Sequence, residues 1–173
     1  VAEVLANARR VLYDTRALRP PPMRDEKIIA AWNGMMIAAF APAGWMLDEA
    51  RYVSLAARAA RFVLEQMTDE DGSLLRTYRN GKKAASSFLD DYAFMVEACL
   101  DLYQATGEVF WLSRSVELQS EQDASYLDAE SGGYLLTPSD GELLLVREKP
   151  AYDGAVPSGN SIAASNLLRL NDI

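Results

Sequence analysis

The sequence predicts an all-α fold in which helices with one polar face alternate with helices that are apolar on most sides. Three observations support this prediction. Apolar residues recur at the helical period through most of the 173 residues. The polar face is present in one such stretch and absent from the next, and 50% of the residues are hydrophobic, enough for a core at this length. We therefore expect three pairs of an outer and an inner helix, in a single helical domain over residues 1–173.

The first outer helix is predicted near the N-terminus, where one face carries apolar residues at helical spacing: Val4, Leu5, Ala8, Val11 and Leu12. It ends before the prolines at 20–22, which cannot continue a helix. Asp25 is placed to cap a second helix over the uncharged run 28–47. That run is long enough for a membrane span, but Asn33 and Pro42 within it favour a buried helix. We expect no membrane partner.

The third helix is predicted to begin after Asp48, which we expect to cap it, and to run to about Met67 with one polar face. The helical period is lost between residues 68 and 87. Within that stretch, residues 74–79 resemble a strand and are followed by Asn80-Gly81, a pair typical of a type I′ hairpin turn. The long loop is therefore expected to carry a short β-hairpin.

A buried fourth helix is predicted from Phe88 to Ala105, and a fifth helix with a polar face from Glu108 to about Gln122. A second long loop follows, in which residues 133–137 and 142–147 are expected to pair as a hairpin. The last buried helix is predicted from Ser158 to Leu170.

The three buried helices recur about 60 and about 70 residues apart, judged from Asn33, Asp91 and Asn160 near their first turns, as in a repeat of helical hairpins. The links into these helices are long, whereas the links out of the first two, residues 42–47 and 106–107, are short. All three N-termini should therefore lie on one face. Helix N-termini present free N–H groups and a positive dipole end, so this face suits an oxygen-rich ligand.

Composition excludes several classes of function. The 17 basic and 25 acidic residues give a net charge of −8, which argues against nucleic-acid and anionic-membrane partners. Histidine is absent, so catalysis would rely on carboxylates, Lys, Tyr or Arg. The single cysteine, Cys99, cannot form an internal disulfide and is interpreted as a core thiol. We expect no metal and no cofactor and, because no signal-peptide pattern is present, a cytoplasmic location.

Three segments carry a family resemblance: 27–41 (KIIAAWNGMMIAAFA), 88–94 (FLDDYAF) and 153–161 (DGAVPSGNS). Together they resemble the helical part of thioredoxin-domain-containing proteins of the spermatogenesis-associated type, also called YyaL-like proteins. The resemblance implies about half of an (α/α)6 toroid of the six-hairpin glycosidase type, similar to N-acylglucosamine 2-epimerases. It also implies a fragment without the thioredoxin-like domain of those proteins. The acid/base pair of the epimerases is histidine, so their mechanism is not carried over to this chain.

Three carboxylates near the predicted helix N-termini are the candidate catalytic groups: Asp91, Asp153 and Asp90. Asp90 and Asp91 point about 100° apart on a helix, so a facing acid/base pair needs one of them together with Asp153. We favour Asp91, because it belongs to the Asp-Tyr-Ala core of the motif. The alternative is that these acids only stabilise the helix dipole.

Seven further residues are candidates for substrate binding. Trp32 and Tyr92 are expected to stack on a sugar ring, Asn33, Asn160 and Ser158 to bind hydroxyl groups, and Arg76 and Tyr78 to bind an acidic substituent. The alternatives remain open: Trp32 as a core residue, Asn33-Gly34 as a close contact between helices, and Ser158 as a helix cap.

The sequence therefore predicts a carbohydrate-active or carbohydrate-binding domain. If it is an enzyme, the expected chemistry is glycoside hydrolase-like or sugar isomerase-like and uses carboxylates. The alternative is a non-catalytic scaffold of a larger protein, whose apolar edges pack on the missing toroid half, a partner domain or a second copy. The expected small-molecule partner is a sugar or another polar molecule.

Overall fold

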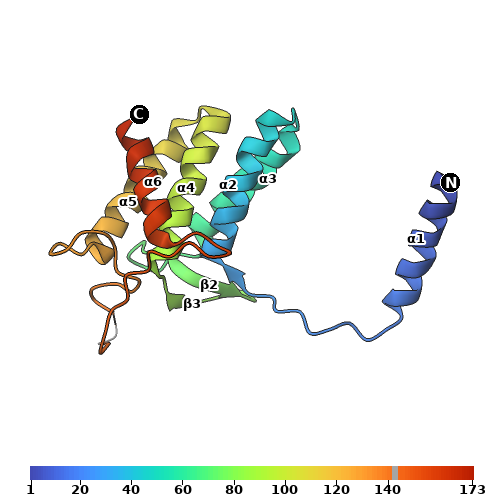
Figure 1. Cartoon of the computed structure of the whole chain (residues 1–173), viewed down its shortest axis with the longest axis horizontal. Helices are drawn as coiled ribbons and strands as arrows, with labels where there is room; N and C mark the ends of the chain where they lie inside the picture. Colours follow the sequence, from blue (N-terminus) through green and yellow to red (C-terminus); the bar gives the residue numbers. More distant parts are fainter. Residues whose placement is uncertain (142–143) are drawn as a thin grey trace.

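The computed structural model describes residues 1–141 and 144–173, and this part of the chain is mostly helical (Figure 1). Three inner helices, α2, α4 and α6, lie side by side with α4 in the middle, and α3 and α5 pack against them. The helices are α1 (Ala2–Ala17), α2 (Ala30–Met46), α3 (Ala50–Gln66), α4 (Leu89–Thr106), α5 (Val109–Tyr126) and α6 (Gly159–Asn171). The predicted alternation of outer and inner helices is confirmed for this body.

Helix α4 is the centre of the core. Ten of its residues from Leu89 to Leu102 and one carboxylate are buried, because α2, α3, α5 and α6 surround it. Cys99 is buried there, as the sequence predicts, and burial raises the pKa of its thiol to about 12. The helix ends at Gly107, whose φ of 70° gives the left-handed conformation that terminates helices. Because α4 touches every neighbour in the body, its first turn can gather the ends of several elements.

Helix α2 packs against α4 through small residues. The buried positions on α2 are almost all Ala or Gly, and a Cβ on Gly34 would lie 2.8 Å from backbone atoms of Phe94. The two helices therefore approach backbone to backbone at this point. The helix continues through Pro42 to Met46, because buried Ala41 and Gly44 keep the last turn packed, so the predicted link from residue 42 is wrong.

A small sheet covers the ends of the inner helices. The predicted hairpin is confirmed as β2 (Leu75–Arg79) and β3 (Lys82–Ser86), joined by Asn80 and Gly81 with φ values of 51° and 78°. Positive φ at both positions is what a type I′ turn requires. A third strand, β1 (Ile28–Ile29), pairs antiparallel with β2, with Ile28 opposite Tyr78. This pairing replaces the helix start predicted after Asp25.

Both predicted aspartate caps are wrong. Asp25 accepts the backbone N–H of Lys27 at 3.1 Å in a turn before β1, and it caps no helix. Asp48 has a φ of 54° and belongs to the end of α2, where the next N–H, of Glu49, donates to the Gly44 carbonyl at 2.7 Å. This is the pattern of a helix C-terminus closed by a left-handed residue. Helix α3 instead begins after Glu49, which makes no side-chain cap.

The second predicted hairpin is not present in the described part of the chain. Glu142 and Leu143 lie outside the described residues, and residues 133–141 and 144–147 form no strand. The loop is held by single contacts instead: an isolated bridge joins Leu127 and Tyr134, and the Leu136 N–H donates to the Glu148 carbonyl at 2.7 Å. These contacts are too few for a stable hairpin, because an isolated pair of strands is only marginally stable in water.

Helix α1 stands apart from the body on an extended linker, so the third predicted outer–inner pair is not formed in this structure (Figure 1). None of its residues is buried. In the residues that the structure describes, no helix has both the length and the apolarity needed to cross a membrane.

The close contact at Gly34 makes a prediction about stability. Gly34→Ala adds a Cβ that the Phe94 backbone cannot accommodate without separating α2 from α4, so the free energy of unfolding should fall by about 1–3 kcal/mol. Urea denaturation measures this change. The control is Ala39→Ser, at an exposed position of the same helix, which should change stability by less than about 0.5 kcal/mol. Equal effects of the two substitutions would show that the contact is not tight.

Candidate functional site

The N-termini of the three inner helices meet at one end of the body, beside the sheet and the long loops (Figure 1). The backbone N–H of Ala31, in the first turn of α2, donates to Asp91 Oδ1 in the first turn of α4 at 2.9 Å. On the other side of α4, a Cβ on Gly159, the first residue of α6, would lie 2.5 Å from Asp90 Oδ1. The expectation of a common face for these three N-termini is confirmed.

Asp91 is buried, and its carboxylate is fully engaged by the protein. Its Oδ2 accepts hydrogen bonds from the Phe88 backbone N–H and the guanidinium of Arg76, both at 2.9 Å. Its Oδ1 accepts the backbone N–H of Ala31. Because Asp91 is the third residue of α4, its side chain folds back on the residue before the helix as in a capping box. The three contacts tie the start of α4 to α2 and to β2.

Arg76 is the cationic partner of Asp91. Its guanidinium lies 4.5 Å from the centre of the Phe88 ring and is partly shielded from water. Burial raises the pKa of Asp91, and the Phe88 N–H and the charge of Arg76 oppose this rise. The sequence suggested that Arg76 binds an acidic substituent of a ligand. In the structure its guanidinium instead forms an ion pair with Asp91.

Asp90 points away from Asp91 and lies, like Asp153, beside the start of α6. Asp90 lies against Gly159, and Asp153 Oδ1 accepts the backbone N–H of Ser158 at 2.9 Å, so the two carboxylates contact consecutive residues. Asp90 is half-buried and Asp153 is exposed. Gly159 allows this approach, since a side chain there would overlap Asp90.

The environments of Asp90 and Asp153 shift their pKa values in opposite directions. Burial raises the pKa of Asp90, and the charge of Asp91 adds to the rise. The hydrogen bond from the Ser158 N–H lowers the pKa of Asp153. One carboxyl therefore holds its proton more tightly than usual and the other less tightly, as an acid/base pair requires.

Two predicted stacking or binding aromatics lie in or near the core. Tyr92 is only 3% exposed, and its hydroxyl accepts the Leu74 N–H at 3.0 Å and donates to Glu121 Oε2 at 3.1 Å. Tyr78 is half-buried and packs edge-on against Phe62, with ring centres 5.1 Å apart. Trp32 differs from both: it is 62% exposed in the first turn of α2. Of the predicted aromatics, Trp32 offers the open ring.

The predicted polar residues mainly hold loops and helix ends. Ser158 caps α6 by accepting the Ser161 N–H at 3.2 Å, which is the alternative weighed from the sequence. Asn160 accepts the Tyr134 N–H and donates to the Tyr134 and Pro150 carbonyls, all within 2.8 Å. It therefore fastens the second long loop onto α6. Asn33 donates to the Ile29 carbonyl at 2.9 Å and lines a groove beside α2.

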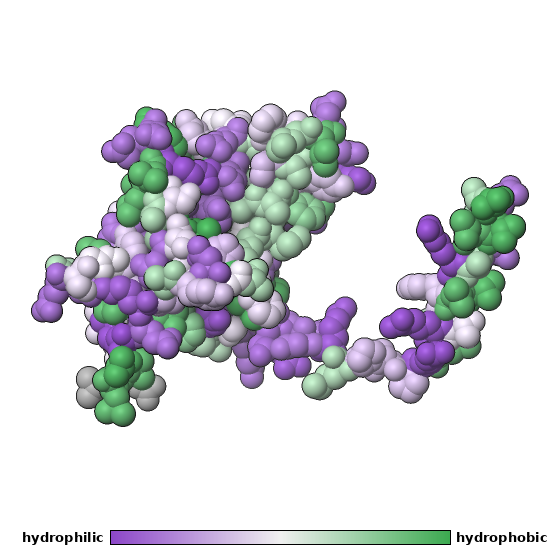
Figure 2. Space-filling model, in the orientation of Figure 1, coloured by the Kyte–Doolittle hydropathy of each residue, from purple (hydrophilic) through white to green (hydrophobic). Residues whose placement is uncertain are grey.

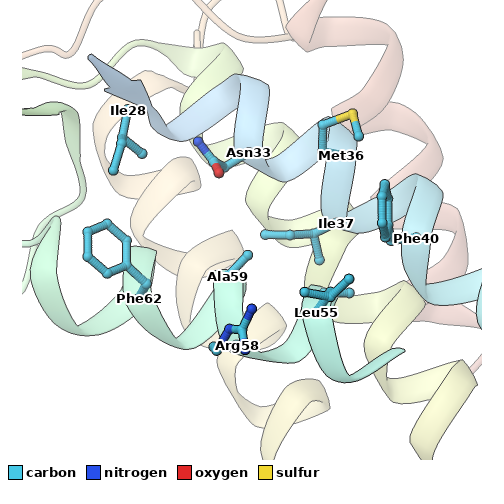
Figure 3. A pocket seen from close by; sticks show the side chains of 10 residues that line it. Ile28, Asn33, Met36, Ile37, Phe40, Leu55, Arg58, Ala59 and Phe62 are labelled. Atoms are coloured by element: carbon cyan, nitrogen blue, oxygen red, sulfur yellow. The ribbon is translucent and has the colours of Figure 1, made fainter. Parts of the chain in front are cut away.

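That groove has no counterpart in the sequence predictions. It runs between α2 and α3 with a volume of about 550 Å³, and side chains of the two helices face one another across it (Figure 3). Apolar residues dominate its lining, among them Met36, Ile37, Phe40, Leu55 and Phe62. Leu55 and Phe62 carried a signal, as large apolar residues outside the main stripe of an amphipathic helix.

Comparison with known proteins places this geometry in context. No family model matches the chain. The chain is 38% identical to spermatogenesis-associated protein 20 of Homo sapiens over an alignment 181 residues long that covers 99% of this chain, and likewise 38% identical to the protein of that name in Rattus norvegicus over an alignment 183 residues long. It spans about a quarter of the length of these relatives, 23% in each case. The predicted family resemblance is confirmed.

Solved structures with similar folds are sugar enzymes. A cellobiose 2-epimerase from Bacillus thermoamylovorans has a TM-score of 0.69 at 19% identity, with 88% of this chain and 42% of that chain covered. A GH76 α-mannanase from Bacteroides thetaiotaomicron has a TM-score of 0.68 at 14% identity, with 89% and 38% covered. The chain thus has the fold of part of an (α/α)6 toroid, as predicted.

The buried carboxylate yields a stability prediction. Asp91→Asn removes the charge opposite Arg76 and replaces one acceptor oxygen with an NH2 donor that faces another N–H, so it should lower the free energy of unfolding by about 3–5 kcal/mol. Asp153→Asn, at an exposed carboxylate, should destabilise the protein much less than Asp91→Asn does. Guanidinium denaturation of both variants checks the difference. Similar losses would mean that Asp91 does not tie the elements together.

A pH prediction follows from Asp90. Because its folded-state pKa is raised above 3.8, the folded protein binds this proton more tightly than the unfolded chain does. Its contribution to stability is greatest at acid pH and is lost as the pH rises from 3.8 through the folded-state pKa. The stability of the wild type minus that of Asp90→Asn should therefore fall as the pH rises from 3.8 through the folded-state pKa of Asp90.

Asp153→Asn is the control for this titration, because the pKa of Asp153 is shifted down. Its contribution is present above 3.8 and is lost as the pH falls toward the folded-state pKa. The stability of the wild type minus that of Asp153→Asn, measured by urea denaturation at each pH, should therefore rise with pH in the acid range. Slopes of the same sign for the two variants would contradict the assignment of the two carboxyls.

Proposed function

We propose that this chain, a homologue of part of spermatogenesis-associated protein 20 with the fold of part of an (α/α)6 toroid, binds a carbohydrate at the N-terminal ends of its inner helices. One observation carries the proposal: Asp90 and Asp153 contact consecutive residues at the start of α6, Gly159 and Ser158, and their pKa values are shifted in opposite directions. Carboxyl pairs of this kind are typical of acid/base sites.

In the proposed site the two carboxyls have different tasks. Asp90, whose proton is held more tightly, donates a proton to a sugar oxygen, and Asp153, which stays ionised, acts as base or nucleophile. Asp91 then acts as a positioning residue, because all its contacts are with Ala31, Phe88 and Arg76. This changes the favoured pair from Asp91 with Asp153 to Asp90 with Asp153.

Trp32 supplies the proposed sugar platform. It is the large aromatic side chain exposed in the first turn of α2, and Asp91 joins that turn to the start of α4, where Asp90 lies. A flat aromatic ring suits the apolar face of a sugar, and the nearby helix N-termini favour its oxygens.

The chemistry of the fold neighbours supports the same ligand class. One acts on cellobiose and the other is a mannanase, so sugars occupy this fold in both. Histidine is absent from the chain, so a carboxylate mechanism of the glycoside hydrolase kind fits these residues better than a histidine-based epimerisation.

A scaffold role is supported by a separate observation. Leu168 on α6 is 70% exposed, and the chain covers only 38% to 42% of these two toroid neighbours. Exposed apolar residues on an edge helix are typical of a surface that packs on further protein. We propose that this edge of α6 packs on the remaining helices of a complete toroid.

Calorimetric titration with cellobiose, mannobiose and their monosaccharides tests the carbohydrate proposal. Trp32→Ala should weaken binding of a recognised sugar about tenfold, because it removes the stacking ring. Trp45→Ala is the matched control, since Trp45 is 63% exposed at the other end of the same helix, and it should bind normally. Asp90→Asn should retain binding and lose any product formation detected by NMR of the anomeric protons.

Two outcomes would contradict the proposal. The first is no saturable binding of any of these sugars by a chain whose circular dichroism and cooperative melting show that it is folded. The second is equal weakening by Trp32→Ala and Trp45→Ala, which would place the sugar away from the inner-helix N-termini.

A further inference from the structure

Helix α1 carries an apolar stripe whose residues are all exposed in the part of the chain that the structure describes. Val4, Leu5, Ala8, Val11 and Leu12 fall within about 120° of the helix circumference. All are exposed, Val4 by 72% and Leu12 by 69% (Figure 2). A stripe of this width normally faces a core, and a lone helix of 16 residues is only marginally stable in water. Helix α1 therefore needs a surface to pack against.

The groove between α2 and α3 is an apolar surface of matching dimensions (Figure 3). Leu55 and Phe62 on its α3 side are seven residues apart, and so are Leu5 and Leu12 on α1. Each pair spans two helical turns, about 10 Å. Met36 and Leu55 remain exposed in the groove, so a helix laid along it would bury apolar surface from both sides.

We infer that α1 docks through its apolar stripe into the α2–α3 groove of the same chain and lies beside α3 as a third outer helix. The other two outer helices set the pattern, since α3 packs on α2 and α4, and α5 packs on α4. Helix α1 precedes α2 in the sequence, and the groove beside α2 is the position that corresponds to it as an outer helix.

The linker selects the same chain over a second copy. Residues 18–27 join α1 to Ile28, which itself lines one end of the groove. About ten residues reach at most ~35 Å, enough to bring α1 back to the groove on which its own linker ends. A short tether of this kind gives an effective concentration in the millimolar range, so a second copy competes poorly in dilute solution. The inference does not depend on sugar binding.

Hydrogen exchange on the full-length chain at low micromolar concentration tests the docking. The amides of α1 should exchange at least about tenfold more slowly than those of an unstructured peptide. Leu55→Asp, which places a charge in the groove, should return them to the unprotected rate. Ser54→Asp, at the adjacent exposed position of α3, is the control and should leave the protection unchanged.

A second pair of variants lies on α1 itself, where a substitution does not disturb the core because no α1 residue is buried there. Leu12→Asp should abolish the protection of α1, whereas Tyr13→Asp, on the opposite face, should preserve it. The body should keep its own protection in both variants, which shows that it remains folded.

Three results would overturn the inference. Unprotected α1 amides in the wild-type chain would show that α1 stays undocked. Protection that survives both Leu55→Asp and Leu12→Asp would place α1 on another surface. Protection that grows with protein concentration, together with a dimer in sedimentation, would show that α1 covers the groove of a second copy instead.

Discussion

The carboxylate of Asp91 holds together three elements that are far apart in the sequence. It accepts hydrogen bonds from the first turn of α2, from Arg76 on β2 and from the residue before α4. A buried charge is tolerated only where such partners satisfy it, so the ends of these elements must meet at this point. The common face of the inner helices, the docking of the sheet and the start of the central helix all depend on this contact.

The contacts of Asp91 also give the adjacent Asp90 different surroundings. Since neighbouring helical residues point about 100° apart, fixing Asp91 inward directs Asp90 to the other side of α4. There it meets the first residue of α6, which has no side chain to exclude it. The Ser158 N–H holds Asp153 beside the preceding residue. The structural role of one aspartate thus sets the surroundings of the other.

The body has apolar surface at both edges, and each edge has a different origin. On the α6 side, Leu168 is exposed to solvent. On the α2 side, the open surface is a groove bounded by two helices, and an amphipathic helix of the same chain is tethered at its end. The α6 edge, which we propose packs on further toroid helices, and the α2–α3 groove, which we propose holds α1, are therefore distinct surfaces.

The sequence by itself determined the alternation of polar-faced and buried helices, the first hairpin with its Asn80-Gly81 turn, and the shared face of the helix N-termini. These features follow from short-range periodicity and turn chemistry. Only the tertiary structure decided that Asp48 ends α2 rather than capping α3, and that Arg76 and Tyr92 bind within the protein. It also decided that Asp90, not Asp91, lies beside the start of α6, where Asp153 binds the Ser158 N–H. A side chain's partners depend on segments distant along the chain, and the local pattern carries no information about their positions.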